Sequence, residues 1–144
     1  MLGRNDYTRS EVDVARARIE DATARFGAMA SAAAKDPKAA KALTAFEATY
    51  FNDLVLVLDR LFVHRVRKVA GSDGNPLNEV ELLVDSLMLN GGDLRALSPI
   101  KYVPANSVLH LELGDEIRLS ADDFTRLSSA FFAELEAKFL SGPR

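Results

Sequence analysis

The sequence lacks cysteine altogether and contains only two histidines among its 144 residues. Without cysteine, disulfide bonds, thiolate catalysis and cysteine-based zinc or iron–sulfur sites are excluded. The two histidines, His64 and His110, lie in no Glu-x-x-His or His-Glu-x-x-His motif, so the usual zinc and di-iron patterns are absent as well. We therefore expect no cofactor. One metal arrangement stays open, in which the fold brings His64, His110 and a carboxylate together.

Long apolar runs and a strong charge of one sign are also missing. The longest apolar run, residues 54–58, is far shorter than the roughly 20 residues of a membrane-spanning helix. Residues 1–6 do not form the apolar core of a signal peptide. The formal net charge of -3 gives no general attraction to nucleic acid or to an anionic membrane. We therefore expect a cytoplasmic protein that does not bind membranes.

The residues that are present suit a single globular domain over residues 1–144. Hydrophobic residues make up 48% and charged residues 27% of the chain, which is enough apolar surface for a core at this length. We expect flexible ends at residues 1–9 and 141–144. A change in composition near residues 91–92 offers an alternative boundary between two sub-modules.

The spacing of apolar residues predicts an N-terminal helical hairpin. Ser10 and Asp13 match a helix start, and apolar residues then recur at alternating spacings of three and four up to Ala33. Asp36 followed by Pro37 matches the start of a second helix, which we expect to continue to about Ala70. Because its middle is apolar on nearly every side, this helix should lie at the centre of the core.

A third helix and a short β-meander should follow. Asn75-Pro76 predicts the start of the third helix and Asn90-Gly91-Gly92 its end. The segments 100–103, 108–113 and 116–119 are β-prone, and Gly114-Asp115 suits a tight hairpin turn. Whether segment 100–103 pairs as a third strand stays open.

Ser120 and Asp123 predict the start of a C-terminal helix. The complete pattern therefore predicts an α+β fold that is predominantly helical, with the antiparallel meander placed before the last helix.

The segment from Gly71 to Glu79 is the first candidate for a binding site. It places backbone N–H groups and the polar side chains of Asp73, Asn75, Asn78 and Glu79 at a helix start, an arrangement that can hold an anion. Helix capping alone accounts for Gly71, Gly74, Asn75 and Pro76, so an ordinary turn between two helices is the favoured interpretation.

The second candidate is the basic segment of His64, Arg65, Arg67 and Lys68. These side chains suggest a proton shuttle, an anion site or phosphate contacts. Cations also gather near helix C-termini because the helix dipole favours them there, and we prefer that explanation. No interleaved aromatic residues and no helix-turn-helix spacing support nucleic-acid binding.

The catalytic motifs of common enzymes are missing. No Gly-x-Ser-x-Gly sequence is present and no Ser/His/Asp order suggests a catalytic triad, so the sequence argues against an enzyme without excluding one. Our leading hypothesis is a protein–protein interaction module that acts as a homodimer, because the hairpin carries more apolar surface than a small monomer can cover. The alternative is a small-molecule or anion-binding protein with its site near the 71–79 loop, and a weaker one is nucleic-acid binding through residues 65–68.

Overall fold

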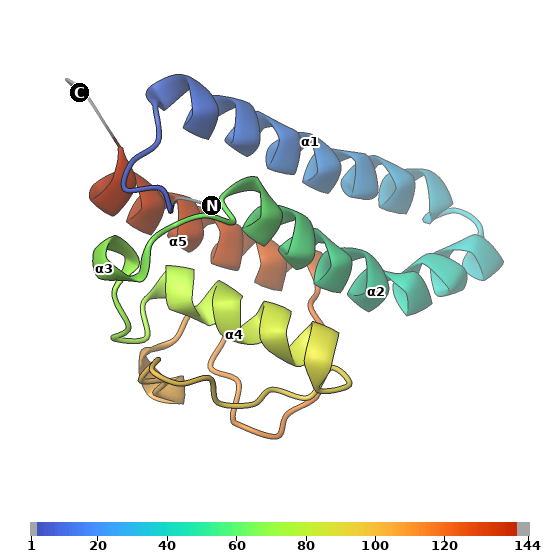
Figure 1. The fold of residues 1–144 in the computed structure, drawn as a ribbon. Coiled ribbons are helices and arrows are strands. Elements are labelled where there is room, and N and C mark those ends of the chain that lie inside the picture. Colours follow the sequence, from blue (N-terminus) through green and yellow to red (C-terminus); the bar gives the residue numbers. More distant parts are fainter. Residues whose placement is uncertain (1–2, 141–144) are drawn as a thin grey trace.

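The computed structural model describes residues 3–140, and in that range the chain is helical with long irregular connections. The elements are α1 (Arg9–Ala33), α2 (Pro37–Leu61), α3 (Arg67–Ala70), α4 (Pro76–Leu89), the 3-10 turn η1 (Pro104–Asn106) and α5 (Ala121–Phe139). Helix α1 packs along α2 and α5, and α4 packs on α2 and α5 from the other side, next to the long segment 90–120 (Figure 1).

Three predicted helix starts are confirmed by their capping hydrogen bonds. The side chain of Asp36 accepts from the first backbone N–H groups of α2, and that of Asn75 does the same for α4. Ser120 and Asp123 form a reciprocal capping box at the start of α5. Each cap satisfies N–H groups that have no partner inside the helix.

The first helix begins earlier than the predicted start at Ser10. Thr8 is the N-cap, and its hydroxyl accepts the Glu11 N–H while the Glu11 carboxylate accepts the Thr8 N–H. Arg4 and Tyr7, which precede the helix, form backbone hydrogen bonds to distant parts of the chain. Tyr7 is only 4% exposed, and its backbone N–H donates to the carbonyl of Phe139 at 2.7 Å.

Helix α2 ends at Leu61, so the predicted continuation to Ala70 is wrong. The N-terminal segment takes the backbone hydrogen bonds that a longer helix would need. The Arg4 N–H donates to the His64 carbonyl at 2.6 Å, and the Val66 N–H donates to the Arg4 carbonyl at 3.0 Å. Residues 62–66 therefore leave the helix, and the short α3 follows them.

The predicted β-meander is absent, since no β-strand occurs between residues 3 and 140. Segments 108–113 and 116–119 do not pair with each other. Instead the Ile117 N–H donates to the Gly92 carbonyl, and the Leu94 N–H donates to the Asp115 carbonyl, both at 2.9 Å. Segment 100–103 forms no strand either. The predicted α+β class and β-hairpin are wrong, and the fold is helical with a long irregular segment between α4 and α5.

Helix side chains supply hydrogen bonds to this irregular segment, and those of Asn52 and Glu79 each bind two of its backbone groups. Asn52 of α2 donates to the Ile117 carbonyl at 2.8 Å and accepts the Leu119 N–H at 3.1 Å. The carboxylate of Glu79 on α4 accepts the N–H groups of the adjacent residues Val108 and Leu109 at 2.8 and 3.0 Å. Backbone groups that a sheet would have paired are therefore satisfied by side chains of neighbouring helices.

The core lies where α2, α4 and α5 meet under α1. Its large side chains are almost fully buried, among them Phe51 and Leu58 of α2, Leu83 of α4, and Phe124 and Phe131 of α5. The repeating apolar residues of α1 also face inward, with Val12, Ala15, Ile19 and Phe26 all buried. The seam of α1 is thus covered within the chain.

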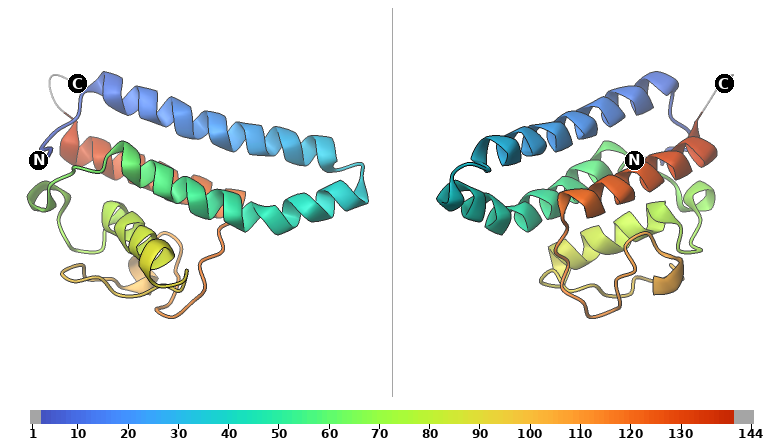
Figure 2. Two further views of the ribbon diagram at one scale, coloured as in Figure 1. Left: turned by 45° about the vertical axis from the view of Figure 1, so that its right-hand side comes forward. Right: turned by 180° about the vertical axis from the view of Figure 1, so that it is seen from behind.

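The turn end of the α1–α2 hairpin extends beyond α4 and α5 (Figure 2). Helix α5 begins at Ala121, whose N–H donates to the Glu47 carboxylate of α2 at 2.7 Å. The part of α2 that precedes Glu47 therefore has α1 beside it but no further helix beneath it.

Candidate functional site

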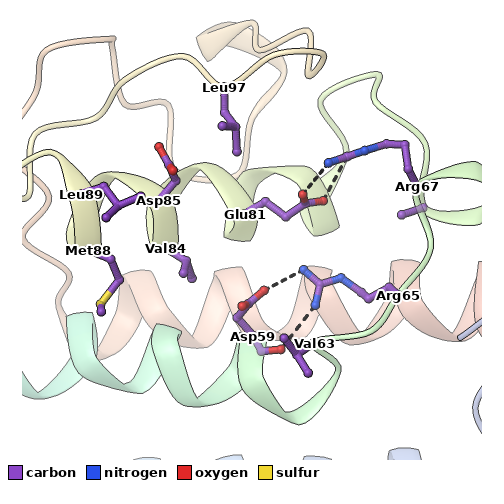
Figure 3. A pocket seen from close by; sticks show the side chains of 11 residues that line it. Asp59, Val63, Arg65, Arg67, Glu81, Val84, Asp85, Met88, Leu89 and Leu97 are labelled. Atoms are coloured by element: carbon purple, nitrogen blue, oxygen red, sulfur yellow. Dashed lines mark hydrogen bonds and ion pairs between the residues drawn. The ribbon is translucent and has the colours of Figure 1, made fainter. Parts of the chain in front are cut away.

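A cleft of about 400 Å³ lies between α2 and α4 (Figure 3). Its apolar lining includes Val63, Val84, Met88, Leu89 and Leu97. Its charged lining consists of Asp59, Arg65, Arg67, Glu81 and Asp85. Two residues of the predicted basic segment, Arg65 and Arg67, therefore line this cleft, whereas the 71–79 loop does not.

Every carboxylate of the cleft is paired with an arginine. Arg65 reaches Asp59 at 2.9 Å, and Arg67 binds Glu81 through two hydrogen bonds of 2.7 and 3.1 Å. Asp85 is paired with Arg95 at 2.8 Å. Charges paired in this way satisfy one another and leave no free carboxylate to act as a general base or a metal ligand.

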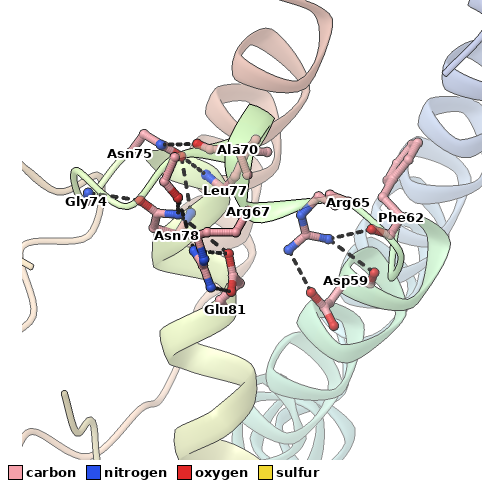
Figure 4. A network of polar contacts seen from close by, with 11 residues as sticks. Asp59, Phe62, Arg65, Arg67, Ala70, Gly74, Asn75, Leu77, Asn78 and Glu81 are labelled. Carbon is pink, nitrogen blue, oxygen red and sulfur yellow. Dashed lines mark hydrogen bonds and ion pairs between the residues drawn. The ribbon is translucent and has the colours of Figure 1, made fainter. Parts of the chain in front are cut away.

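Arg65 caps the end of α2. Its side chain is 4% exposed and donates to the carbonyl of Phe62 at 2.9 Å, in addition to the Asp59 carboxylate (Figure 4). Its guanidinium lies 5.3 Å from the centre of the Phe131 ring. The guanidinium therefore adds a charged hydrogen bond to the carbonyl of Phe62 at the C-terminal end of α2, where the helix dipole favours a cation.

The other residues of the basic segment lie apart from one another. His64 is half-buried, and its carbonyl accepts the Arg4 N–H. Lys68 on α3 is exposed and forms no hydrogen bond or ion pair within residues 3–140. Since Arg65 is buried and Arg67 is paired, Lys68 is the one cation of positions 65–68 that is free in the described range. A single lysine is a small electrostatic footprint for nucleic acid.

The polar side chains of the 71–79 loop bind one another and the nearby backbone (Figure 4). Asn75 caps α4 with its side-chain oxygen and donates to the Ala70 carbonyl at 2.8 Å with its side-chain nitrogen. Asn78, which is fully buried, accepts the Gly74 N–H and donates to the Gly71 carbonyl, both at 2.9 Å. These contacts account for the loop as a junction between α3 and α4.

Two positive backbone angles complete this junction. Gly71 and Gly74 have φ values of 79° and 90°, which favour glycine. A side chain at Gly74 would also collide with the carbonyl oxygen of Lys101. Asp73 is exposed, and the hydrogen bond from the Asn75 amide lowers its pKa below the ordinary value.

Glu79 differs from its neighbours because it is a buried carboxylate, with 2% of its surface exposed. Burial raises its pKa above the ordinary value, while the N–H groups of Val108 and Leu109 oppose that rise. The side chain thus fastens the irregular segment to α4. Its partners lie 29 and 30 residues away in the sequence. The location of Glu79 in the first turn of α4 therefore did not predict that it would bind the irregular segment.

Metal-binding geometry is not found in residues 3–140, where no three or more His, Asp or Glu side chains converge as ligands would. His110 lies in the irregular segment and its ring nitrogen Nδ1 is 3.0 Å from the Pro104 carbonyl. Over the same range, no helix is both long enough and apolar enough to cross a membrane.

A second surface lies on the side of α2 that α1, α4 and α5 leave open. A hollow of about 400 Å³ there is lined by Arg18 of α1 and by Leu56, Val57, Arg60 and Leu61 of α2. An adjoining hollow of about 410 Å³ shares Arg18 and Leu61 and adds Val14, which is 68% exposed. We call this surface, made of Val14, Arg18, Leu56, Val57, Arg60 and Leu61, the hairpin face.

The hairpin face was missed among the candidate residues. Its sequence signal is the spacing of Asp53, Leu56, Val57 and Arg60, which places one acidic, two apolar and one basic residue on a single stripe of α2.

Comparison of the chain with protein-family models, with curated proteins and with solved structures finds no match.

Proposed function

We propose that this protein is a non-enzymatic protein–protein interaction module that forms a homodimer through the hairpin face. The observation that carries the proposal is an apolar surface left uncovered on α1 and α2. Val14 is 68% exposed, and Leu56, Val57 and Leu61 are each partly exposed, whereas Leu54, Val55 and Leu58 on the inner side of α2 are buried. Exposed apolar surface edged by polar groups is typical of protein interfaces.

The charges of the hairpin face support the same function. Arg18 and Arg60 are exposed and have no hydrogen bond or ion pair within residues 3–140. The α2–α4 cleft, by contrast, has all its carboxylates paired. Unpaired charges beside an apolar centre match the rim and core of an interface, whereas paired charges in a cleft offer little to a substrate. The lack of cysteine and the mild negative charge fit our proposal of a cytoplasmic location.

Two matched variants test which apolar surface makes the contact. Val14→Glu places a charge on the hairpin face, and Met88→Glu places one beside the α2–α4 cleft, where Met88 is 63% exposed. Both wild-type side chains are mostly in solvent, so both folded monomers should tolerate the change. Light scattering after size-exclusion chromatography over a range of concentrations measures the dimer.

We expect Val14→Glu to raise the dimer dissociation constant by at least about tenfold, because a charge would be buried at the contact. Met88→Glu should leave it unchanged. A dimer weakened by Met88→Glu and not by Val14→Glu would move the interface to the cleft and contradict the proposal.

A further inference from the structure

We infer that two copies of this chain pack antiparallel along α2, about a two-fold axis at Leu56 and Val57, so that Asp53 of each copy meets Arg60 of the other. This inference rests on the proposed homodimer and specifies its register and its partner. The partner is a second copy of the same chain.

The four residues form one stripe on the open side of α2. They lie at positions i, i+3, i+4 and i+7, which fall on the same helix face. Neighbouring residues Leu54, Val55 and Leu58 are buried against the rest of the core. Asp53 and Arg60 are exposed, and Leu56 and Val57 between them are half-buried.

The two charges at the ends of the stripe lack partners in their own chain. Neither Asp53 nor Arg60 has a hydrogen bond or ion pair within residues 3–140. Their Cα atoms are about 10 Å apart along the helix axis, which separates them beyond an ordinary ion pair. Nearby charges behave differently, since Asp59 is bound by Arg65 and Asp21 by Arg25.

The order of charges makes the stripe complementary to its own reverse. Along α2 it reads acidic, apolar, apolar, basic, so an antiparallel copy presents basic opposite acidic at both ends. A two-fold interface requires this kind of self-complementary surface. A parallel copy would place like charges opposite each other, which disfavours association.

Helix α1 leaves room for the second copy. Arg16 of α1 binds Glu136 of α5. Arg18 follows two residues later, which is a rotation of about 200° around the helix axis, so its side chain lies on the side of α1 away from α5. Arg18 shares the hollow with Leu56 and Arg60, which places a second unpaired cation near the acidic end of an antiparallel partner. Charge complementarity and the apolar centre thus favour the same partner.

Charge reversal tests this register. Asp53→Arg and Arg60→Asp each place like charges at both ends of the contact. We expect each to raise the dimer dissociation constant by about tenfold, measured by sedimentation equilibrium. An equal mixture of the two variants should form heterodimers, because one copy then carries two cations and the other two anions. The double variant D53R/R60D should regain wild-type affinity.

Matched controls separate the register from a general effect of charge. Glu20→Arg, at an exposed residue of α1, reverses the charge in the same way as Asp53→Arg. Lys68→Asp, on α3, reverses it in the same way as Arg60→Asp. Both controls should keep wild-type affinity. Circular dichroism melts establish that all variants fold, which is expected because the substituted side chains are exposed.

The outcomes distinguish the inference from the function on which it rests. A wild-type chain that stays monomeric would overturn both. A wild-type dimer that neither charge variant weakens, or variants that show no preference for the heterodimer, would overturn the antiparallel register and leave the homodimer standing.

Discussion

The side-chain amide of Asn52 on α2 accepts the backbone N–H of Leu119, 67 residues later in the chain, at 3.1 Å. The same amide donates to the carbonyl of Ile117 at 2.8 Å. Those two backbone groups belong to alternate residues of an extended segment, and a neighbouring strand would satisfy such groups in the same way. Asn52 therefore takes the place of a strand and fixes the segment that leads into α5.

Removing the Asn52 amide should destabilise the fold. Asn52→Ala leaves the Leu119 N–H and the Ile117 carbonyl without these partners, and we expect the free energy of unfolding to fall by about 1–3 kcal/mol. Asn52→Asp keeps the acceptor for Leu119 but places a carboxylate oxygen against the Ile117 carbonyl, so it should destabilise the fold as well. Urea denaturation measures both. An alanine variant within about 0.5 kcal/mol of wild type would show that the two contacts contribute little.

Glu79 should be required for the order of the irregular segment. Glu79→Ala deprives the N–H groups of Val108 and Leu109 of their acceptor, and we expect a loss of about 1–3 kcal/mol in the free energy of unfolding. Hydrogen exchange should speed up more at these two amides than at amides in the middle of α2, whose protection falls only with the overall stability. Unchanged exchange at residues 108 and 109 would contradict the anchoring role.

The buried carboxylate of Glu79 should also give stability a specific pH dependence. Because burial raises the pKa of Glu79 above its ordinary value of 4.5, the folded chain binds this proton more tightly than the unfolded chain. The contribution to stability is fully present below pH 4.5 and is lost as the pH rises through the raised pKa.

The variant Glu79→Gln cannot titrate and isolates this effect. We expect the unfolding free energy of wild type, measured relative to Glu79→Gln, to decrease as the pH rises from below 4.5 through the window between the two pKa values. Thermal or urea denaturation at a series of pH values gives both curves. A relative stability that increases over that window would mean that the N–H groups of Val108 and Leu109 outweigh burial.

Arg65 should act through the fold. Arg65→Met leaves the Asp59 carboxylate and the Phe62 carbonyl without their guanidinium, and we expect a loss of about 3 kcal/mol because the arginine is buried. Lys68→Met removes an exposed cation and should stay within about 0.5 kcal/mol of wild type. Adding Asp59→Asn to Arg65→Met should recover part of the loss. Equal effects of the two single variants on thermal stability would argue against this capping role.

Local capping patterns predicted several elements correctly. Asp36-Pro37, Asn75-Pro76 and Ser120 with Asp123 each mark a helix start that the structure confirms, because these side chains bind backbone groups only a few residues away. Thr8 and Glu11 form a second possible capping box, next to Ser10 and Asp13, and the structure uses the Thr8–Glu11 pair. Choosing that pair would have placed the start of α1 correctly.

Long-range contacts explain what the sequence could not predict. The alternation in segment 116–119 does bury Ile117 and Leu119, which are 2% and 3% exposed, but it cannot show that Asn52 rather than a strand binds their backbone. The end of α2 likewise depends on Arg4, some 60 residues earlier. Alternating burial and hydrogen-bond pairing are separate properties, and only the first can be read from local periodicity.

The roles of the candidate residues could likewise be predicted only where their contacts are local in the sequence. Asn75 caps α4 as expected, because the backbone groups that it binds are close in the sequence. Asn78, for which capping gave no explanation, binds the backbone of Gly71 and Gly74 in the same loop. The spacing of Asp53 and Arg60 can be read from the sequence. Which side of α2 stays uncovered depends on the packing of α1, α4 and α5, and the sequence does not give that packing.

A native mass spectrum of the untagged protein tests the central claim most directly. The chain has a mass of 15.7 kDa, and our account predicts a complex of twice that mass with no bound ligand, whose share falls on dilution and in the Val14→Glu variant. A monomer at all concentrations would contradict the homodimer. A monomer that carries additional mass would instead favour a small-molecule or anion-binding protein.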